Sequence, residues 1–359
     1  MSTLPQADLD PHPPGGPPGG PARVPNLDPG PNFGRRAVAI LRYPETITIA
    51  LLLIAFGVGA SLSDKFLSAQ GLLDSTSLYM ENGVMALAMT LIIIAGHIDL
   101  SVAANLALSA VLTAKLHAAG LPMEAAMCVG PLIGAALGLF NGLLVTRLKL
   151  PSLVVTLGTM ALFRGVAQIL AGDQSITGLP EWFTGIDYRT VGPLPLPLVI
   201  FLVLAVIVGV VLKKTTIGRN VYALGTNEAA ARFAGLRTGR YTLGIFVFSG
   251  LMAGVGAMMM ISRLNVARFD HANGDELAVI TAVVLGGTDI FGGRGSIVGT
   301  VAALFLLGFI RQGMGLANFT AESQLAVTGS LLVGAVLLSR LLDQVARRLD
   351  RTFGGKPNV

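Results

Sequence analysis

Polar side chains lie within several otherwise apolar stretches of this 359-residue chain. Amide and hydroxyl groups there hydrogen-bond either to a neighbouring helix or to a solute that itself carries hydroxyl groups. For the majority of these residues, taken one at a time, we expect a hydrogen bond to a neighbouring helix. A charge inside an apolar stretch is costly, and for Arg164 we weigh a structural bridge and a solute-contact role equally. The residues we select as candidates to line a path through the apolar region are Asn82, Thr90, Asn105, Arg164 and Thr281.

The spacings typical of enzyme and metal sites are missing from the sequence. The phosphate-binding pattern G-x-x-x-x-G-K-[ST] is absent, because the only lysine that follows a glycine is Lys356. No H-E-x-x-H pattern occurs, and the single cysteine, Cys128, forms neither an intramolecular disulfide nor a cysteine metal site. We therefore predict no catalytic residue, no metal site and no cofactor bound by this chain.

Composition places the chain in a membrane. Hydrophobic residues make up 53% of it and charged residues only 13%, about half the usual share in a soluble protein. Apolar runs recur at nearly the length of about 20 residues that a bilayer-crossing helix needs. This excludes a soluble enzyme, a nucleic-acid-binding protein and a secreted disulfide-rich protein. We predict an all-α, polytopic membrane protein of about ten transmembrane helices, at 43–61, 78–96, 99–119, 122–146, 152–171, 194–212, 240–262, 275–290, 296–316 and 323–342.

Lysine and arginine are unevenly divided between the two ends of these predicted spans. If the N-terminal segment lies inside, 18 of the 25 lie on that side, six on the other and Arg164 within a span. Positive charge concentrates in cytoplasmic segments, so we predict that both termini are cytoplasmic. We divide the chain into a disordered Pro/Gly-rich cytoplasmic tail (1–36), a membrane domain (37–345) and a basic cytoplasmic tail (346–359).

Glycines recur every four residues along the fourth apolar run. At this spacing they share one helical face and allow a neighbouring backbone to approach closely. Gly250 and Gly254 repeat the spacing in a later run. We predict a helix-packing role for Gly130, Gly134, Gly138 and Gly142.

Three stretches carry a resemblance to a known family. They are Gly96-His97-Ile98-Asp99-Leu100-Ser101-Val102, the segment 218–236 and the segment 285–296. Together they resemble the permease subunits of bacterial ABC importers of the ribose, xylose and rhamnose type, over about 43–342. The resemblance implies a ten-span permease of the bacterial plasma (inner) membrane that performs no bond chemistry itself. It implies a small sugar as solute: a pentose, a deoxyhexose or a related polyol-like compound.

The resemblance also implies partners. A second permease, identical or related, would pair with the chain in the lipid bilayer. Two ATPase subunits, which bind the ATP and Mg, would lie on the cytoplasmic side, and an extracytoplasmic sugar-binding protein would dock on the other side; no nucleic acid is implied. Two alternatives stay open: an ABC permease for branched-chain amino acids or nucleosides, and a secondary transporter. The latter needs acidic residues placed for ion coupling, and few are present.

The cytoplasmic loop after the sixth span is the implied ATPase contact, at about Thr226–Leu236. The sequence differs slightly from the family's Glu-Ala-Ala…Gly motif here, because Gly235 comes one residue later than is usual in the motif. The residues themselves favour a short helix, because alanines support it, a glycine can end it and an acidic side chain suits its first turn. The predicted coupling residues are Glu228, Ala229, Ala230 and Gly235.

Overall fold

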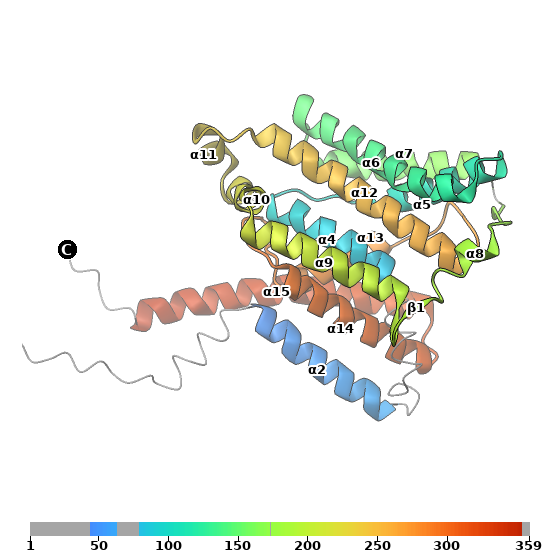
Figure 1. Cartoon of the computed structure of the whole chain (residues 1–359). Coiled ribbons are helices and arrows are strands. Elements are labelled where there is room, and N and C mark those ends of the chain that lie inside the picture. The colour runs from blue at the N-terminus through green and yellow to red at the C-terminus, as the bar shows by residue number, and fades with distance from the viewer. Residues whose placement is uncertain (1–43, 63–78, 173, 354–359) are drawn as a thin grey trace, which may run out of the picture.

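The computed structural model describes residues 44–62, 79–172 and 174–353, and these are predominantly helical (Figure 1). Each of the ten predicted apolar runs contains a helix, so the chain is an all-α, polytopic membrane protein. The helices are α2 (Pro44–Leu62), α4 (Met80–Ile94), α5 (Val102–Ala118), α6 (Met123–Arg147), α7 (Ser152–Ala171), α9 (Leu196–Lys214), α12 (Thr238–Leu264), α13 (Asp275–Leu285), α14 (Ile297–Leu316) and α15 (Ala321–Phe353). The predicted tail 1–36 lies outside the described residues, and α15 runs into the predicted tail 346–359.

Five further short elements lie in the connections. Between α7 and α9 are α8 (Glu181–Thr184) and an antiparallel hairpin of β1 (Thr190–Val191) and β2 (Leu194–Pro195). Between α9 and α12 are α10 (Thr216–Thr226) and α11 (Glu228–Phe233).

Length and apolar composition together distinguish five of the ten helices. Five described helices are long and apolar enough to cross a bilayer: α6, α7, α9, α12 and α14. In contrast, α13 has 11 residues, roughly 16 Å of helix against a hydrocarbon core of about 30 Å. It ends because Gly287 adopts a φ of 89° and Thr288 N–H bonds back to the Val283 carbonyl. The predicted ten spans and the cytoplasmic position of both termini therefore stay predictions.

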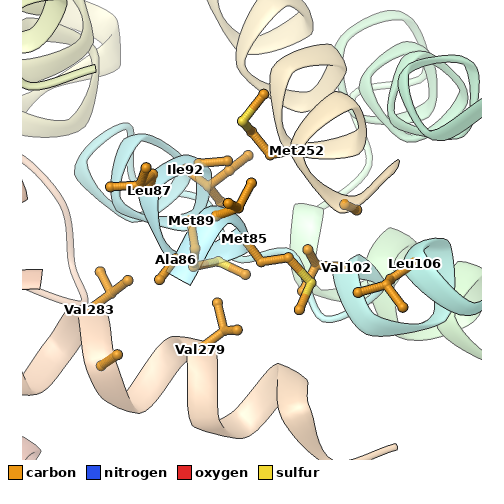
Figure 2. Packing of buried hydrophobic residues seen from close by; sticks show 14 of the residues in the cluster. Met85, Ala86, Leu87, Met89, Ile92, Val102, Leu106, Met252, Val279 and Val283 are labelled. Carbon is orange, nitrogen blue, oxygen red and sulfur yellow. The ribbon is translucent and has the colours of Figure 1, made fainter. Parts of the chain in front are cut away.

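The helix α4 forms the centre of the bundle. All 15 of its residues are buried, as expected for a helix that is apolar on every side. It packs against α9, α12, α13 and α14. Figure 2 shows Met252 of α12 on one side of α4 and Val279 and Val283 of α13 on the other. Any movement of α4 must therefore displace several neighbouring helices.

Helices α6 and α12 cross at backbone contact. A Cβ on Gly134 would overlap the carbonyl oxygen of Gly250, and one on Gly138 would overlap that of Phe246. Gly130 and Gly142 face the side chains of Met258 and Leu243 instead. All four glycines selected from the sequence thus lie on the face of α6 that contacts α12.

Candidate functional site

Glycines from three distant segments meet where α4 ends. Gly293 N–H donates to the Ile94 carbonyl over 2.8 Å. A Cβ on Gly225 would overlap that same carbonyl oxygen, and a Cβ on Gly292 would lie 2.9 Å from the Cα of Gly96. Only glycine fits these positions without displacing backbone. We call Gly96, Gly225, Gly292 and Gly293 the glycine junction; it brings together the stretches 96–102, 218–236 and 285–296.

Polar contacts fix the loop 286–296 to α10. The Tyr222 hydroxyl donates to the Gly295 carbonyl over 2.7 Å. Within the loop, Asp289 Oδ1 accepts the backbone N–H of Phe291 at 3.0 Å, and Asp289 N–H donates to the Arg294 carbonyl. These bonds connect α10 to the loop, which itself contacts the end of α4 through Gly293.

The helix expected within 226–236 forms as α11. Asn227 caps it, because its Oδ1 accepts the backbone N–H of Ala230 at 2.9 Å. Glu228 pairs with Arg232 one turn later, and Gly235, with a φ of 86°, follows the helix end. The four predicted coupling residues, Glu228, Ala229, Ala230 and Gly235, are all exposed, whereas Ala231 faces inward.

An exposed aromatic residue lies beside them. Phe233 ends α11 and is 93% exposed. Figure 1 shows α11 beyond the end of α12, away from the central helices. Phe233 was not among the residues predicted from the sequence, although it is an aromatic side chain in the most polar stretch between spans. An exposed ring of this size is suited to insertion into a partner's pocket.

A buried polar cluster lies deeper in the bundle, at the start of α5. Asp99 Oδ1 accepts the backbone N–H of Ser101 at 3.0 Å and its hydroxyl at 2.6 Å. Asp99 Oδ2 accepts the Ser249 hydroxyl at 2.9 Å. Asn141 Nδ2 donates to Ser101 Oγ over 2.8 Å, while Asn141 Oδ1 has no partner among the described residues. Asp99, Ser101, Asn141 and Ser249 form what we call the Asp99 cluster, which joins the stretch before α5 to α6 and α12.

The path candidates selected from the sequence have separate hydrogen-bond partners. Asn105 Nδ2 donates to the Gly134 carbonyl at 3.1 Å, and Thr90 Oγ1 lies 2.9 Å from Thr300 Oγ1. Thr281 bonds within its own helix to the Leu277 carbonyl. Asn82 is buried and its Oδ1 has no partner among the described residues. No hydrogen bond in the described parts of the chain joins any two of the five, and their path role stays a prediction.

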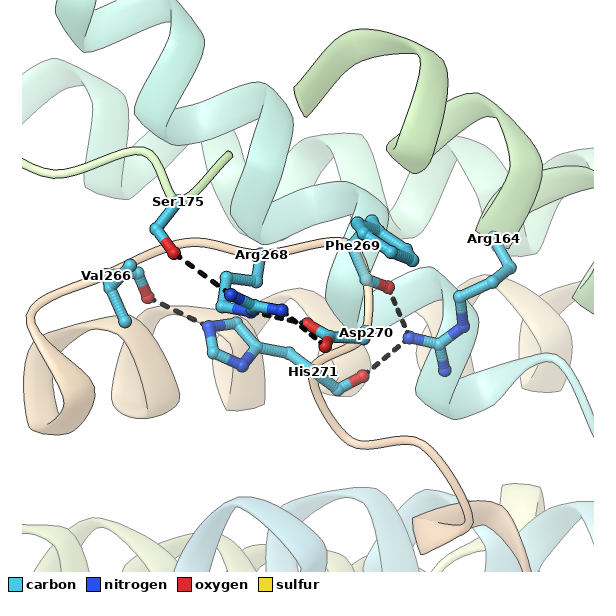
Figure 3. A network of polar contacts seen from close by, with 7 residues as sticks. All are labelled: Arg164, Ser175, Val266, Arg268, Phe269, Asp270 and His271. Carbon is cyan, nitrogen blue, oxygen red and sulfur yellow. Dashed lines mark hydrogen bonds and ion pairs between the residues drawn. The ribbon is translucent and has the colours of Figure 1, made fainter. Parts of the chain in front are cut away.

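Arg164 lies beside the loop between α12 and α13 (Figure 3). Its Nη1 donates to the backbone carbonyls of Phe269 and His271, each at 2.6 Å. In the same loop, Arg268 binds the Asp270 carboxylate through two bonds of 2.7 Å, and this lowers the pKa of Asp270 below its ordinary value. These two bonds suit a structural bridge, one of the two roles considered for Arg164, and a role on the solute path stays a prediction.

Comparisons with known proteins place these segments in a family. Residues 71–336 match the family described as "Branched-chain amino acid transport system / permease component", and the chain belongs to this family. It is also similar to the Autoinducer 2 import system permease protein LsrD of Escherichia coli K12, with 35% identity over 307 residues, 83% of this chain and 92% of that protein. The protein of the same name from Yersinia enterocolitica is 34% identical over 299 residues, covering 82% and 90%. No solved structure matches the chain.

Family membership confirms the resemblance to importer permeases and identifies a transport subunit, not an enzyme. It also confirms the expected membrane location, in agreement with the apolar helices.

Proposed function

We propose that this chain is the membrane-spanning subunit of an ATP-driven importer that moves a small sugar or polyol-like solute across the bacterial inner membrane. ATP and Mg would bind to a partner ATPase. The support is the similarity to a permease that imports autoinducer 2 and the hydroxyl and amide groups buried between the helices. Neither of these two observations favours a branched-chain amino acid over a hydroxylated compound as the solute.

The glycine junction is the observation that carries the proposal. An ATPase that displaces α11 would move α10 with it, because only Asn227 separates the two helices. At the junction α10 meets α4 and the loop 286–296 backbone to backbone, so no flexible side chain absorbs the motion. The displacement would therefore reach the central helix as a rigid-body shift.

A second connection runs through α12. This helix begins at Thr238, five residues after α11 ends, and carries Ser249, which bonds to Asp99. Movement of α12 would thus pull on the stretch that leads into α5. The two routes reach α4 and α5, the helices on which Asn82, Thr90 and Asn105 lie. Shifting them would open the path alternately to the two sides.

The remaining partners are proposed from the family. An extracytoplasmic binding protein would dock at the end opposite α11, where the loops 172–193 and 265–274 pair through Ile176 and Ala267. A second permease copy or a paralogue would pack against the lipid-facing helices.

Bulk on the exposed face of α11 tests this proposal. Ala230→Trp should abolish solute uptake while the chain still inserts, because a large ring prevents close approach to an ATPase groove. The matched control is Ala119→Trp, an exposed alanine that follows α5. Glu228→Gln should be milder, since its pair with Arg232 is exposed.

The measurements are uptake of autoinducer 2 and of pentoses, and co-purification of the ATPase. Normal uptake by Ala230→Trp with the ATPase still bound would remove α11 from the coupling role. Uptake by the purified chain alone in liposomes would instead identify a secondary transporter.

A further inference from the structure

An open groove lies between the end of α6 and the start of α12. It has two adjoining parts of about 490 and 440 Å³, and both are lined by Leu236, Arg237 and Arg240. Arg147, the last residue of α6, and Arg232 of α11 line the second part. We call the groove defined by Arg147, Arg232, Arg237 and Arg240 the arginine groove. Four guanidinium groups around one hollow indicate a ligand with negative charge.

Among the described residues, three of these four arginines have no acidic partner. Only Arg232 has one, its neighbour Glu228 at 2.6 Å. Arg147, Arg237 and Arg240 have no ion pair among the described residues. Arginines at the other end of the bundle differ: Arg263 pairs with Glu81, Arg268 with Asp270 and Arg311 with Asp275. The arginine groove therefore keeps a net positive charge, whereas the opposite end does not.

The groove also has an apolar side. Leu236 and Leu243 line it. On α6, one to two turns before Arg147, Leu143 and Phe140 are 37% and 42% exposed on a helix long enough to span the bilayer. Positive charge at the end of such a helix, with exposed apolar side chains along it, suits a ligand with an anionic head and hydrocarbon chains. Free phosphate would use only the first of these features.

We propose that the arginine groove binds the phosphodiester headgroup of an anionic membrane lipid, with the acyl chains along α6. Arg232 of α11 lines the groove, so a bound lipid would brace the segment to which we assign ATPase coupling. Lipid binding itself does not depend on that assignment, because it is measured on the chain without an ATPase.

The test is lipid retention by the purified full-length chain, measured by native mass spectrometry after titration with phosphatidylglycerol, phosphatidylcholine or inorganic phosphate. The variant is Arg237→Gln/Arg240→Gln. Arg219→Gln, an exposed arginine on α10 outside the groove, is the matched control. Arg237→Lys/Arg240→Lys keeps the charge and reports whether the groove still folds.

We expect the native chain and Arg219→Gln to retain phosphatidylglycerol over phosphatidylcholine. The glutamine double variant should bind it about 30-fold more weakly, because each basic side chain near an anionic lipid contributes about fivefold. The lysine variant should keep most of the binding.

Equal phosphatidylglycerol retention by the glutamine variant would overturn the proposal. Displacement of the lipid by inorganic phosphate at the same concentration would identify a free-anion site instead. Unchanged lipid binding with loss of ATPase co-purification would identify a protein contact.

Discussion

Ser249 donates a hydrogen bond of 2.9 Å to Asp99, and this bond ties the middle of α12 to the segment between α4 and α5. The two residues are 150 positions apart in the sequence and both are buried. Asp99 accepts two more hydrogen bonds, both from Ser101. A buried carboxylate is tolerated only when donors surround it, so Ser249 both stabilises Asp99 and connects the two elements.

Ser249→Ala should therefore weaken both folding and transport. The change leaves one carboxylate oxygen of Asp99 without its donor, at a cost of about 1–3 kcal/mol in the free energy of unfolding. The measurements are the melting temperature in detergent and solute uptake by cells. Ser330→Ala removes a hydroxyl that bonds only within its own helix, at an exposed position, and serves as the control. Equal melting temperatures for the two variants would show that the hydrogen bond from Ser249 to Asp99 does not stabilise the fold.

Gly134→Ala should disrupt the crossing of α6 and α12. The added methyl group would overlap the Gly250 carbonyl, so we expect a loss of about 1–3 kcal/mol in the free energy of unfolding. Gly158→Ala on α7 is the control, because no atom lies within 4 Å of its added Cβ. Gly120 could not serve as the control, because its φ of 103° would strain any side chain placed there. If both alanine variants melt at the same temperature, the close contact between Gly134 and Gly250 does not determine the stability of the protein.

Much of the fold was predictable because apolar runs of helical length are a strong signal. Span length was harder to predict: the eighth run looked apolar to residue 290, yet Gly286-Gly287 ends α13 at Leu285. Local composition reports hydrophobicity, while the end of a helix depends on one backbone conformation.

The contacts at the site were less predictable because they join distant segments. Each of the three motif stretches contains glycines, but no side chain indicates that Gly225 lies against Ile94. Likewise, Arg164 was recognisable as an unusual charge, whereas its partners are backbone carbonyls, which every residue has. Asp99 was visible within a motif, but Ser249 is one of many serines in the chain.

Cysteine labelling tests the predicted orientation. In a Cys128→Ser background, Tyr188→Cys, in the loop before β1, should react with an impermeant maleimide in intact cells. Lys214→Cys, at the end of α9, should react only after permeabilisation. Both native residues are exposed, so access depends on the side of the membrane. Labelling of Lys214→Cys in intact cells would contradict a cytoplasmic α10–α11 segment.

Arg164→Gln separates the two roles considered for this residue. If Arg164 acts as a bridge, losing its bonds to the Phe269 and His271 carbonyls should lower the free energy of unfolding by about 1–3 kcal/mol. The KM for solute uptake should then stay unchanged. Arg189→Gln, an exposed arginine in the loop before β1, is the control. A raised KM with an unchanged melting temperature would instead place Arg164 on the solute path.

The loop 265–274 should loosen as the pH falls. Burial lowers the pKa of His271 below its ordinary value, and the hydrogen bond from Nε2 to the Val266 carbonyl offsets this only in part. The native loop therefore binds fewer protons than the opened loop. The neutral His271 side chain therefore stabilises the closed loop above about pH 6.5. This stability is lost as the pH falls from there through the lowered pKa of His271.

Over the same range Asp270 stays ionised, because Arg268 lowers its pKa. We expect hydrogen exchange of the amides in 265–274, corrected for intrinsic rates, to accelerate from about pH 7 to about pH 5. His271→Gln keeps a donor for Val266 but does not titrate, so its exchange should be independent of pH. The same pH dependence in both proteins would assign the effect to another group.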